Sequence, residues 1–196
     1  ARVQDEARDA GIAVKVMPAL DQVVSRGMRG SDLRDLSVDD LLGRALVNTN
    51  VSDIAGYLKG KRVLVTGAGG SIGSQLCIEI TRFAPSRLMM LDRDETGLQA
   101  VQIGTQGNGL LESEDVILAD IRDIDTLQKI FQERQPEVVF HAAALKHLPM
   151  LEHYPDEAWK TNVQGTLNVL RAAQGVGVEV FVNVSTDKAA DPTSVL

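Results

Sequence analysis

The sequence is poor in cysteine and contains no long apolar run. Cys77 is the only cysteine in 196 residues, so the chain cannot form an internal disulfide or a cysteine-rich zinc site. A single thiol is compatible with a reducing, cytoplasmic setting. No stretch of about 18 apolar residues occurs, which argues against a membrane-spanning helix. The charged first residues do not resemble a secretory signal.

The sequence also lacks an excess of positive charge. It has 20 Lys and Arg against 27 Asp and Glu residues, giving a net charge of −7. A surface that binds nucleic-acid phosphates needs the opposite balance, so we expect no nucleic-acid partner. The three histidines do not have zinc-site spacing and no acidic cluster completes such a site, so we expect no metal. The composition, 44% hydrophobic and 24% charged, is that of an ordinary globular chain.

The hydrophobic pattern changes near residue 60. Before it, the sequence predicts one strand, Ile12–Met17, and two short helices, at 21–29 and 38–44. So few elements make a poor independent core. We therefore expect residues 1–60 to be the tail of a preceding domain plus a linker, and residues 61–196 to form a domain of their own.

From Lys61 onward, short apolar runs alternate with segments of helical periodicity. The apolar runs predict five strands, at Arg62–Thr66, Arg87–Leu91, Val116–Ala119, Val138–Ala142 and Val178–Val184. The segments between them predict four helices, at Ser71–Phe83, Glu95–Ile103, Asp123–Arg134 and Pro155–Gln174. This alternation predicts a parallel sheet with helices on both faces. In a dinucleotide-binding fold the five strands would have the order 3-2-1-4-5.

A glycine-rich turn, TGAGGSIG, joins the first predicted strand to the first helix. Gly67 permits the tight turn, Gly70 lets the backbone approach a pyrophosphate, and Gly73 lets the helix pack closely. The N–H groups of Ser71 and Ile72, at the positive end of the helix dipole, can then hold the anion. The alternative is a glycine-rich turn without a ligand, which the strand-to-helix context disfavours.

Asp92 ends the second predicted strand, 19 residues after Gly73. An acid at this distance can accept hydrogen bonds from the ribose hydroxyls of NAD, whereas a nearby arginine accommodates the 2′-phosphate of NADP. The sequence supplies both groups, Asp92 and Arg93. We favour NAD, because a carboxylate at the strand end would repel a phosphate. In the alternative interpretation, Asp92 caps the following helix.

Further candidates lie at the ends of the third and fourth predicted strands. Asp120 can reach an adenine amino group, although it is equally suited to a turn. The small residues Ala142–Ala144 leave space for a flat ring and a ribose, or else allow tight helix–sheet packing. Lys146 and His147 lie just past the fourth strand, where open α/β sheets bind ligands. His141 lies inside an apolar strand, so we interpret it as a core residue.

The segment Ser185–Lys188 directly follows the fifth predicted strand. At the carboxyl end of a strand, such a segment directs its side chains into the ligand crevice. The adjacent Asp187 and Lys188 can divide acid and base roles, since each charge alters the proton affinity of the other. The alternative is a solvated turn whose aspartate caps the next segment.

Five stretches together resemble the CapD-like polysaccharide biosynthesis family: VLVTGAGGSIGSQL, LDRDE, VVFHAAALKHLPMLE, TNVQGTLNV and FVNVSTDKAADPTSVL. These proteins are nucleotide-sugar 4,6-dehydratases of the extended short-chain dehydrogenase/reductase superfamily. The resemblance covers Lys61–Leu196, and LSVDDLLGRALV is similar to the segment that precedes the dehydratase domain in long members. It implies an α/β fold, a Rossmann-type doubly wound parallel sheet, here truncated at the C-terminus.

The resemblance implies a reaction on a UDP-linked N-acetylhexosamine, most often UDP-N-acetylglucosamine. NAD or NADP takes the C4 hydride, the ketone acidifies the C5 proton, water leaves from C6, and the hydride returns to C6. By motif, Asp187 is the acid at C6, Lys188 the base at C5, and Thr186 a hydrogen-bond partner at the C4 oxygen. Lys146 and His147 are expected at the sugar.

The same motifs imply cofactor contacts from the glycine turn and the strand ends. The residues are Gly67, Gly70, Ser71, Ile72, Gly73, Asp92, Arg93, Asp120, Ile121, Ala142, Ala143, Ala144, Lys146 and Ser185. Asn162 is expected to tie the long helix to the active-site strand. This sequence departs from the superfamily's Tyr-x-x-x-Lys pair. The tyrosine position is occupied by Leu196, and the lysine position falls beyond the given sequence. We therefore expect another group to act at C4, and no turnover by this 196-residue piece.

Two other functions stay open. A nucleotide-sugar epimerase acting at C4 or C5 shares the 4-keto intermediate. A non-catalytic NAD(P)-binding regulatory module would need the glycines but not Asp187 or Lys188. The resemblance further implies a homo-oligomer, located in the cytoplasm or held at the cytoplasmic face of the inner membrane by N-terminal segments that this chain lacks.

Overall fold

The computed structural model describes residues 15–16, 34–35, 51–186 and 189. The chain divides into two compact units, Ala1–Thr49 and Asn50–Leu196. In the first, the described residues form an antiparallel pair, β1 (Lys15–Val16) and β2 (Arg34–Asp35).

The first unit carries three sequence predictions. β1 falls within the predicted strand Ile12–Met17. The two helices predicted at 21–29 and 38–44 lie outside the described residues.

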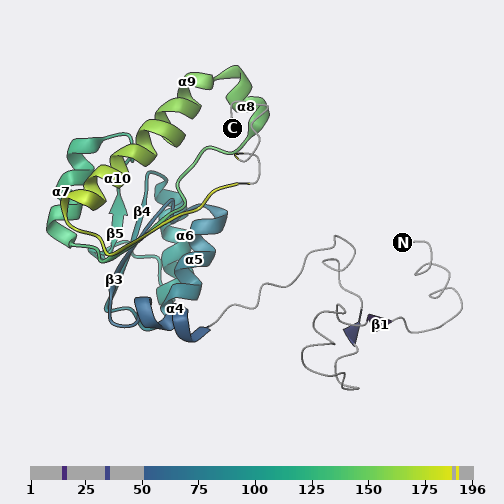
Figure 1. Ribbon diagram of the computed structural model, residues 1–196, viewed down its shortest axis with the longest axis vertical. Coiled ribbons are helices and arrows are strands. Elements are labelled where there is room, and N and C mark those ends of the chain that lie inside the picture. The colour runs from purple at the N-terminus through teal and green to yellow at the C-terminus, as the bar shows by residue number, and fades with distance from the viewer. Residues whose placement is uncertain (1–14, 17–33, 36–50, 187–188, 190–196) are drawn as a thin grey trace, which may run out of the picture. The chain divides into compact units, whose positions relative to one another are not determined.

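The second unit alternates strands and helices (Figure 1). Its strands are β3 (Arg62–Thr66), β4 (Arg87–Asp92), β5 (Val116–Leu118), β6 (Val138–His141) and β7 (Val180–Asn183). Its helices are α4 (Val51–Leu58), α5 (Ser71–Thr81), α6 (Glu95–Gln106), α7 (Ile124–Arg134), α8 (Leu148–His153), α9 (Pro155–Ala158), the π-helix η2 (Trp159–Gly165) and α10 (Thr166–Gly175).

The five strands form one parallel sheet with the order β5-β4-β3-β6-β7. Counted from the first predicted strand, this is 3-2-1-4-5, so the predicted fold class is confirmed. Because all the strands are parallel, their carboxyl ends lie at one edge of the sheet. The turn after β3 and the segments after β4, β5, β6 and β7 therefore leave the sheet on the same side.

Side chains from both faces of the sheet are buried. On β3, Val63 and Val65 pack in a cluster with residues of α4, α5 and α6. Leu64, between them, packs in a second cluster with residues of α7 and α10. Figure 1 shows these two groups of helices on opposite sides of the strands. Burial on both faces explains why the strands are continuous apolar runs in the sequence.

The amino edge of the sheet is held together by ion pairs. Lys61 Nζ lies 3.0 Å from Glu137 Oε1 and 2.8 Å from Glu179 Oε2, so one ammonium links the segments that lead into β3, β6 and β7. The Arg62 N–H also donates to Glu137 Oε2 at 3.0 Å.

Some helix limits differ from the predictions. α6 continues past Ile103 through Gly104 to Gln106, and Gly107, with φ 74°, ends it in the left-handed conformation. The predicted helix Pro155–Gln174 is helical throughout, but its middle turn adopts the π register of η2.

Two helices of the second unit were not predicted. α8 precedes the long helix, and α4 lies before the expected domain start at residue 61. α4 buries Leu58 in the same cluster as Val63. Among the described helices, none has the length and apolar character needed to cross a bilayer.

Candidate functional site

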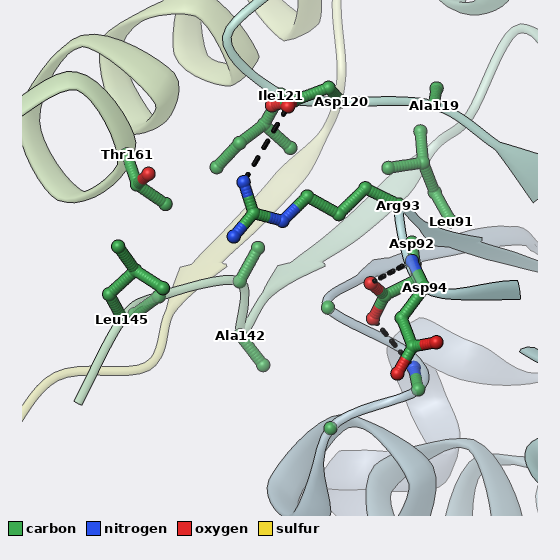
Figure 2. Close-up of a pocket in the computed structure, with 15 residues that line it drawn as sticks. Leu91, Asp92, Arg93, Asp94, Ala119, Asp120, Ile121, Ala142, Leu145 and Thr161 are labelled. Carbon is green, nitrogen blue, oxygen red and sulfur yellow. Dashed lines mark hydrogen bonds and ion pairs between the residues drawn. The ribbon is translucent and has the colours of Figure 1, made fainter. Parts of the chain in front are cut away.

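A cleft lies at the carboxyl edge of the sheet, where β3, β4, β5 and β6 end (Figure 2). Nine of its lining residues were predicted cofactor contacts: Gly67, Gly70, Asp92, Arg93, Asp120, Ile121, Ala142, Ala143 and Ala144. Six others were not predicted: Gly69, Leu91, Asp94, Ala119, Leu145 and Thr161. The remaining predicted contacts, Ser71, Ile72, Gly73, Lys146 and Ser185, do not line it.

Gly67 and Gly73, at the two ends of the glycine-rich segment after β3, fit only without a side chain. Gly67 has φ +70°, and a Cβ there would lie 2.6 Å from the backbone of Ala143. A Cβ on Gly73 would overlap the carbonyl oxygen of Gly67. Gly73 thus packs the first turn of α5 against the glycine turn itself. These close contacts bring the turn, α5 and the segment after β6 together at the cleft.

The start of α5 offers polar groups of positive character. Gly70 is its N-cap residue; no side chain caps the helix and its first turn holds no acid. Backbone N–H groups at such a helix start attract anions. Lys146 Nζ, from the segment after β6, donates to the Ser71 Oγ at 3.3 Å. The structure therefore brings together Lys146 and Ser71, two predicted contacts that lie outside the cleft lining.

Asp92 is fixed at the end of β4 by two backbone hydrogen bonds. Its Oδ2 accepts the Gly69 N–H at 2.8 Å and its Oδ1 accepts the Asp94 N–H at 3.0 Å. Figure 2 shows both bonds. The alternative that Asp92 caps α6 is wrong, because Asp94 is the N-cap residue and accepts the Thr96 N–H. The Asp92 carboxylate therefore joins β4 to the glycine turn and borders the cleft.

Arg93 extends through the cleft toward Asp120 (Figure 2), with 3.7 Å between Nη1 and Oδ2. Asp120 also pairs with Arg122, whose Nη2 lies 2.6 Å from Oδ2. Burial raises the pKa of Asp120, but hydrogen bonds and charge from Arg122, together with the charge of Arg93, outweigh this and lower it. The carboxylate is thus held ionised between two arginines.

The far wall of the cleft is held by the long helix. The Asn162 Oδ1 accepts the Leu145 N–H at 2.8 Å, and the Asn162 Nδ2 donates to the Leu145 carbonyl at 2.9 Å. Asn162 therefore ties the helix to the segment after β6. Asn162, which makes both bonds, belongs to η2, and the π register of this helix adds one residue to the turn.

Thr161, also in η2, was missed by the sequence analysis. It is 6% exposed and lines the cleft, and its Oγ1 has no hydrogen-bond partner among the described residues. A buried hydroxyl without a partner is costly, so it indicates a polar ligand at this point. The motif TNVQGTLNV contains Thr161, but no local signal separates a hydroxyl that faces a ligand from one on any helix face.

His141, at the end of β6, is a buried core residue as predicted, with 2% exposure. Its Nδ1 lies 2.6 Å from the Thr66 Oγ1 and its Nε2 lies 2.9 Å from the Thr166 Oγ1. The imidazole also lies near the Phe181 ring, with 6.2 Å between the two ring centroids. None of these neighbours is titratable, and burial lowers the pKa of His141 from 6.5 to about 4.

This burial predicts loss of stability in acid. Between about pH 6.5 and pH 4 the unfolded chain binds a proton at His141 that the folded protein does not, so the free energy of unfolding falls as the pH falls. The full effect is about 3 kcal/mol. Urea unfolding at stepped pH should show this loss, and His141→Gln should remove it. His153→Gln, which deletes an exposed imidazole, is the control and should leave it unchanged.

The predicted catalytic segment is described only in part. The Val184 N–H donates to the His141 carbonyl at 2.9 Å, so the chain leaves β7 beside the end of β6. Ser185 and Thr186 follow and are exposed. Asp187 and Lys188 lie outside the described residues. His147 lies at the N-cap of α8, exposed, two residues after Leu145. Among the described residues, no three His, Cys, Asp or Glu side chains gather as a metal site.

The parallel sheet, its strand order and the cleft at its carboxyl edge define a Rossmann-type protein of the extended short-chain dehydrogenase/reductase class. Residues 63–196 match the family described as polysaccharide biosynthesis protein. The chain belongs to this family, and the resemblance inferred from the sequence is confirmed.

Two curated relatives show how much of a longer protein the chain covers. A Bacillus subtilis protein named probable polysaccharide biosynthesis protein EpsC is 41% identical over 189 residues, which are 95% of this chain and 31% of the relative. A Campylobacter jejuni UDP-N-acetylglucosamine 4,6-dehydratase (inverting) is 33% identical over 136 residues, 69% of this chain and 39% of the enzyme. The chain thus spans about a third of the length of these relatives.

A solved structure supports the fold. The UDP-glucose 4-epimerase of Stenotrophomonas maltophila, with bound NAD and formylated UDP-arabinopyranose, aligns with a TM-score of 0.56 at 28% identity. The alignment covers 65% of this chain and 38% of the epimerase.

Proposed function

We propose that the whole protein is a nucleotide-sugar 4,6-dehydratase, with a UDP-linked N-acetylhexosamine as substrate and NAD as resident cofactor. One observation carries the proposal: the glycine turn, the Asp92 carboxylate and the chain leaving β7 toward Thr186 all lie at one edge of the sheet. The 33% identity to the Campylobacter jejuni dehydratase supports it.

The cleft residues fit a nicotinamide dinucleotide. The close contact with Ala143 excludes a side chain at position 67 and keeps the backbone of the glycine turn at the cleft, which suits close approach of a diphosphate. The Thr161 hydroxyl, which has no hydrogen-bond partner within the described part of the chain, supplies a polar group in the wall of the cleft. NAD rather than NADP is proposed, because the fixed Asp92 carboxylate suits a ribose hydroxyl and repels a phosphate. The NAD bound to the Stenotrophomonas epimerase supports this choice.

The residues of the chain would divide the reaction between them. Bound NAD would supply the hydride chemistry, oxidation at C4 of the sugar and return of the hydride at C6, with no net oxidation. Thr186 would donate a hydrogen bond to the C4 oxygen, whose own proton would pass to a further basic group, since Leu196 stands at the superfamily's tyrosine position. Lys188 would remove the C5 proton that the ketone has acidified, and Asp187 would protonate the departing C6 hydroxyl as water. Lys188 would then return its proton to C5 as the hydride reaches C6. Lys146 and His147 contact the sugar nucleotide.

A second candidate is a nucleotide-sugar epimerase, and the aligned Stenotrophomonas epimerase favours it. An epimerase uses the same C4 oxidation but returns the hydride to C4, so its product keeps the mass of the substrate. The two functions therefore differ in one measurable quantity, the mass of the sugar nucleotide.

The test incubates the intact protein with UDP-N-acetylglucosamine and measures the product by mass spectrometry. A product lighter by one water is the expected result, and denaturation should release NAD. An isomer of unchanged mass would make the protein an epimerase. No conversion, despite bound cofactor, would favour a regulatory module, and released NADP would reverse the cofactor assignment.

A further inference from the structure

A chain of buried and partly buried hydrogen bonds starts next to the cleft residues Gly67 and Ala142. Thr66 and His141 are neighbouring partners on β3 and β6, and the chain continues from His141 to Thr166 at the start of α10. The Thr166 Oγ1 then donates to the Asn162 carbonyl at 2.7 Å. Three elements of the fold are thus joined by side chains that the proposed reaction does not use.

The direction of each hydrogen bond follows from the last one. The Thr166 hydroxyl gives its only proton to the Asn162 carbonyl, so its oxygen accepts from the His141 Nε2–H. With the proton on Nε2, the neutral ring accepts at Nδ1, and the Thr66 hydroxyl donates to it. The hydrogen-bond chain therefore fixes His141 in the tautomer with its proton on Nε2, and each group in it is either a donor or an acceptor at a known atom.

Three members of this hydrogen-bond chain, Thr66, His141 and Asn162, adjoin residues that line the cleft. Thr66 immediately precedes Gly67, and His141 immediately precedes Ala142. At the other end lies Asn162, whose side chain holds both backbone groups of Leu145. Figure 2 shows Leu145 facing the cleft opposite Arg93, with Thr161 beside it. The hydrogen-bond chain thus reaches from the glycine turn to the wall of the cleft formed by Leu145 and Thr161.

We infer that His141 and Thr166 are positioning residues for the cofactor: they hold Asn162, and through it Leu145, at a fixed place relative to the glycine turn. Neither side chain lines the cleft, so they act through the backbone that they hold. This inference rests on the proposed function, because it names the nicotinamide dinucleotide as the ligand whose walls are positioned.

The test compares Thr166→Val with Thr166→Ser in the intact protein. Valine keeps the shape but removes the hydroxyl, whereas serine keeps the hydroxyl. The control is Val169→Ala, which removes buried contacts from the same helix without touching the hydrogen-bond chain. Two quantities are measured on folded protein: the exchange rate of the Leu145 amide without ligand, and the dissociation constant for NAD.

In Thr166→Val we expect faster Leu145 exchange and about tenfold weaker NAD binding, the scale typical of losing an outer hydrogen bond behind a ligand site. Thr166→Ser should retain wild-type values, and Val169→Ala should lower stability without changing affinity.

Equal affinities in Thr166→Val and Val169→Ala would overturn the inference, even if Leu145 exchanged faster, and would leave the proposed function standing. If the wild-type protein bound no NAD, both this inference and the proposed function would be wrong.

Discussion

Gly67→Ala should weaken NAD binding and lower turnover by roughly 100-fold. Alanine at φ +70° costs about 1–2 kcal/mol in backbone strain. Its Cβ would also lie 2.6 Å from the Ala143 backbone, so the turn and the segment after β6 must separate by about 1 Å to reach van der Waals contact. A displacement of that size in a ligand site costs roughly 100-fold in rate. Titration with NAD and a turnover assay measure the two losses.

The matched control is Gly177→Ala. Gly177 has φ +69°, almost the value of Gly67, but nothing lies within 4 Å of a Cβ placed there. It should therefore show only the backbone cost, as a modest fall in the free energy of unfolding, with NAD binding unchanged. If Gly67→Ala and Gly177→Ala bound NAD equally well, the close contact with Ala143 would have no role in the cleft.

Asp187→Asn should lower dehydration of UDP-N-acetylglucosamine by about 10²–10⁴-fold. Asparagine keeps the size of the side chain but cannot supply the proton that the C6 hydroxyl needs to leave as water. Because Asp187 has no proposed contact with the cofactor, the amount of NAD released on denaturation should not change. Steady-state kinetics should show the loss in kcat, with KM little altered.

Asp191→Asn provides the comparison, since it makes the same chemical change four residues along the same segment. It should retain most of the activity. Equal losses in Asp187→Asn and Asp191→Asn would mean that the segment tolerates neither change, and the proposed acid would be wrong. Wild-type turnover in Asp187→Asn would exclude that role directly.

The strand predictions succeeded because a strand buried on both faces is a continuous apolar run. β3 spans Arg62–Thr66 as predicted, and β4 is one residue longer than its predicted run. The strand order followed from assigning the sheet to the dinucleotide-binding type, whose strands have the order 3-2-1-4-5. The helix limits were less accurate because a glycine inside a helix, such as Gly104, resembles a loop residue in sequence.

The glycine turn and the strand-end acids could be found from their spacing, but their contacts could not. Asp92 and Asp94 are equally plausible caps in the sequence LDRDE, and only the fold shows Asp94 capping α6 while Asp92 holds the glycine turn. Thr161 lines the cleft from η2, where the helix shifts into the π register. No periodicity of 3.6 residues predicts such a shift.

The sequence by itself determined the class of fold, the strand order, the glycine turn and the family. Each of these depends on residues close together in the chain or on the period of apolar residues. Only the tertiary structure decided which polar groups meet: Asp92 with Gly69, Asn162 with Leu145, and His141 with Thr66 and Thr166. These partners lie 17 to 75 residues apart, so their contacts arise only when the sheet and the long helix pack together.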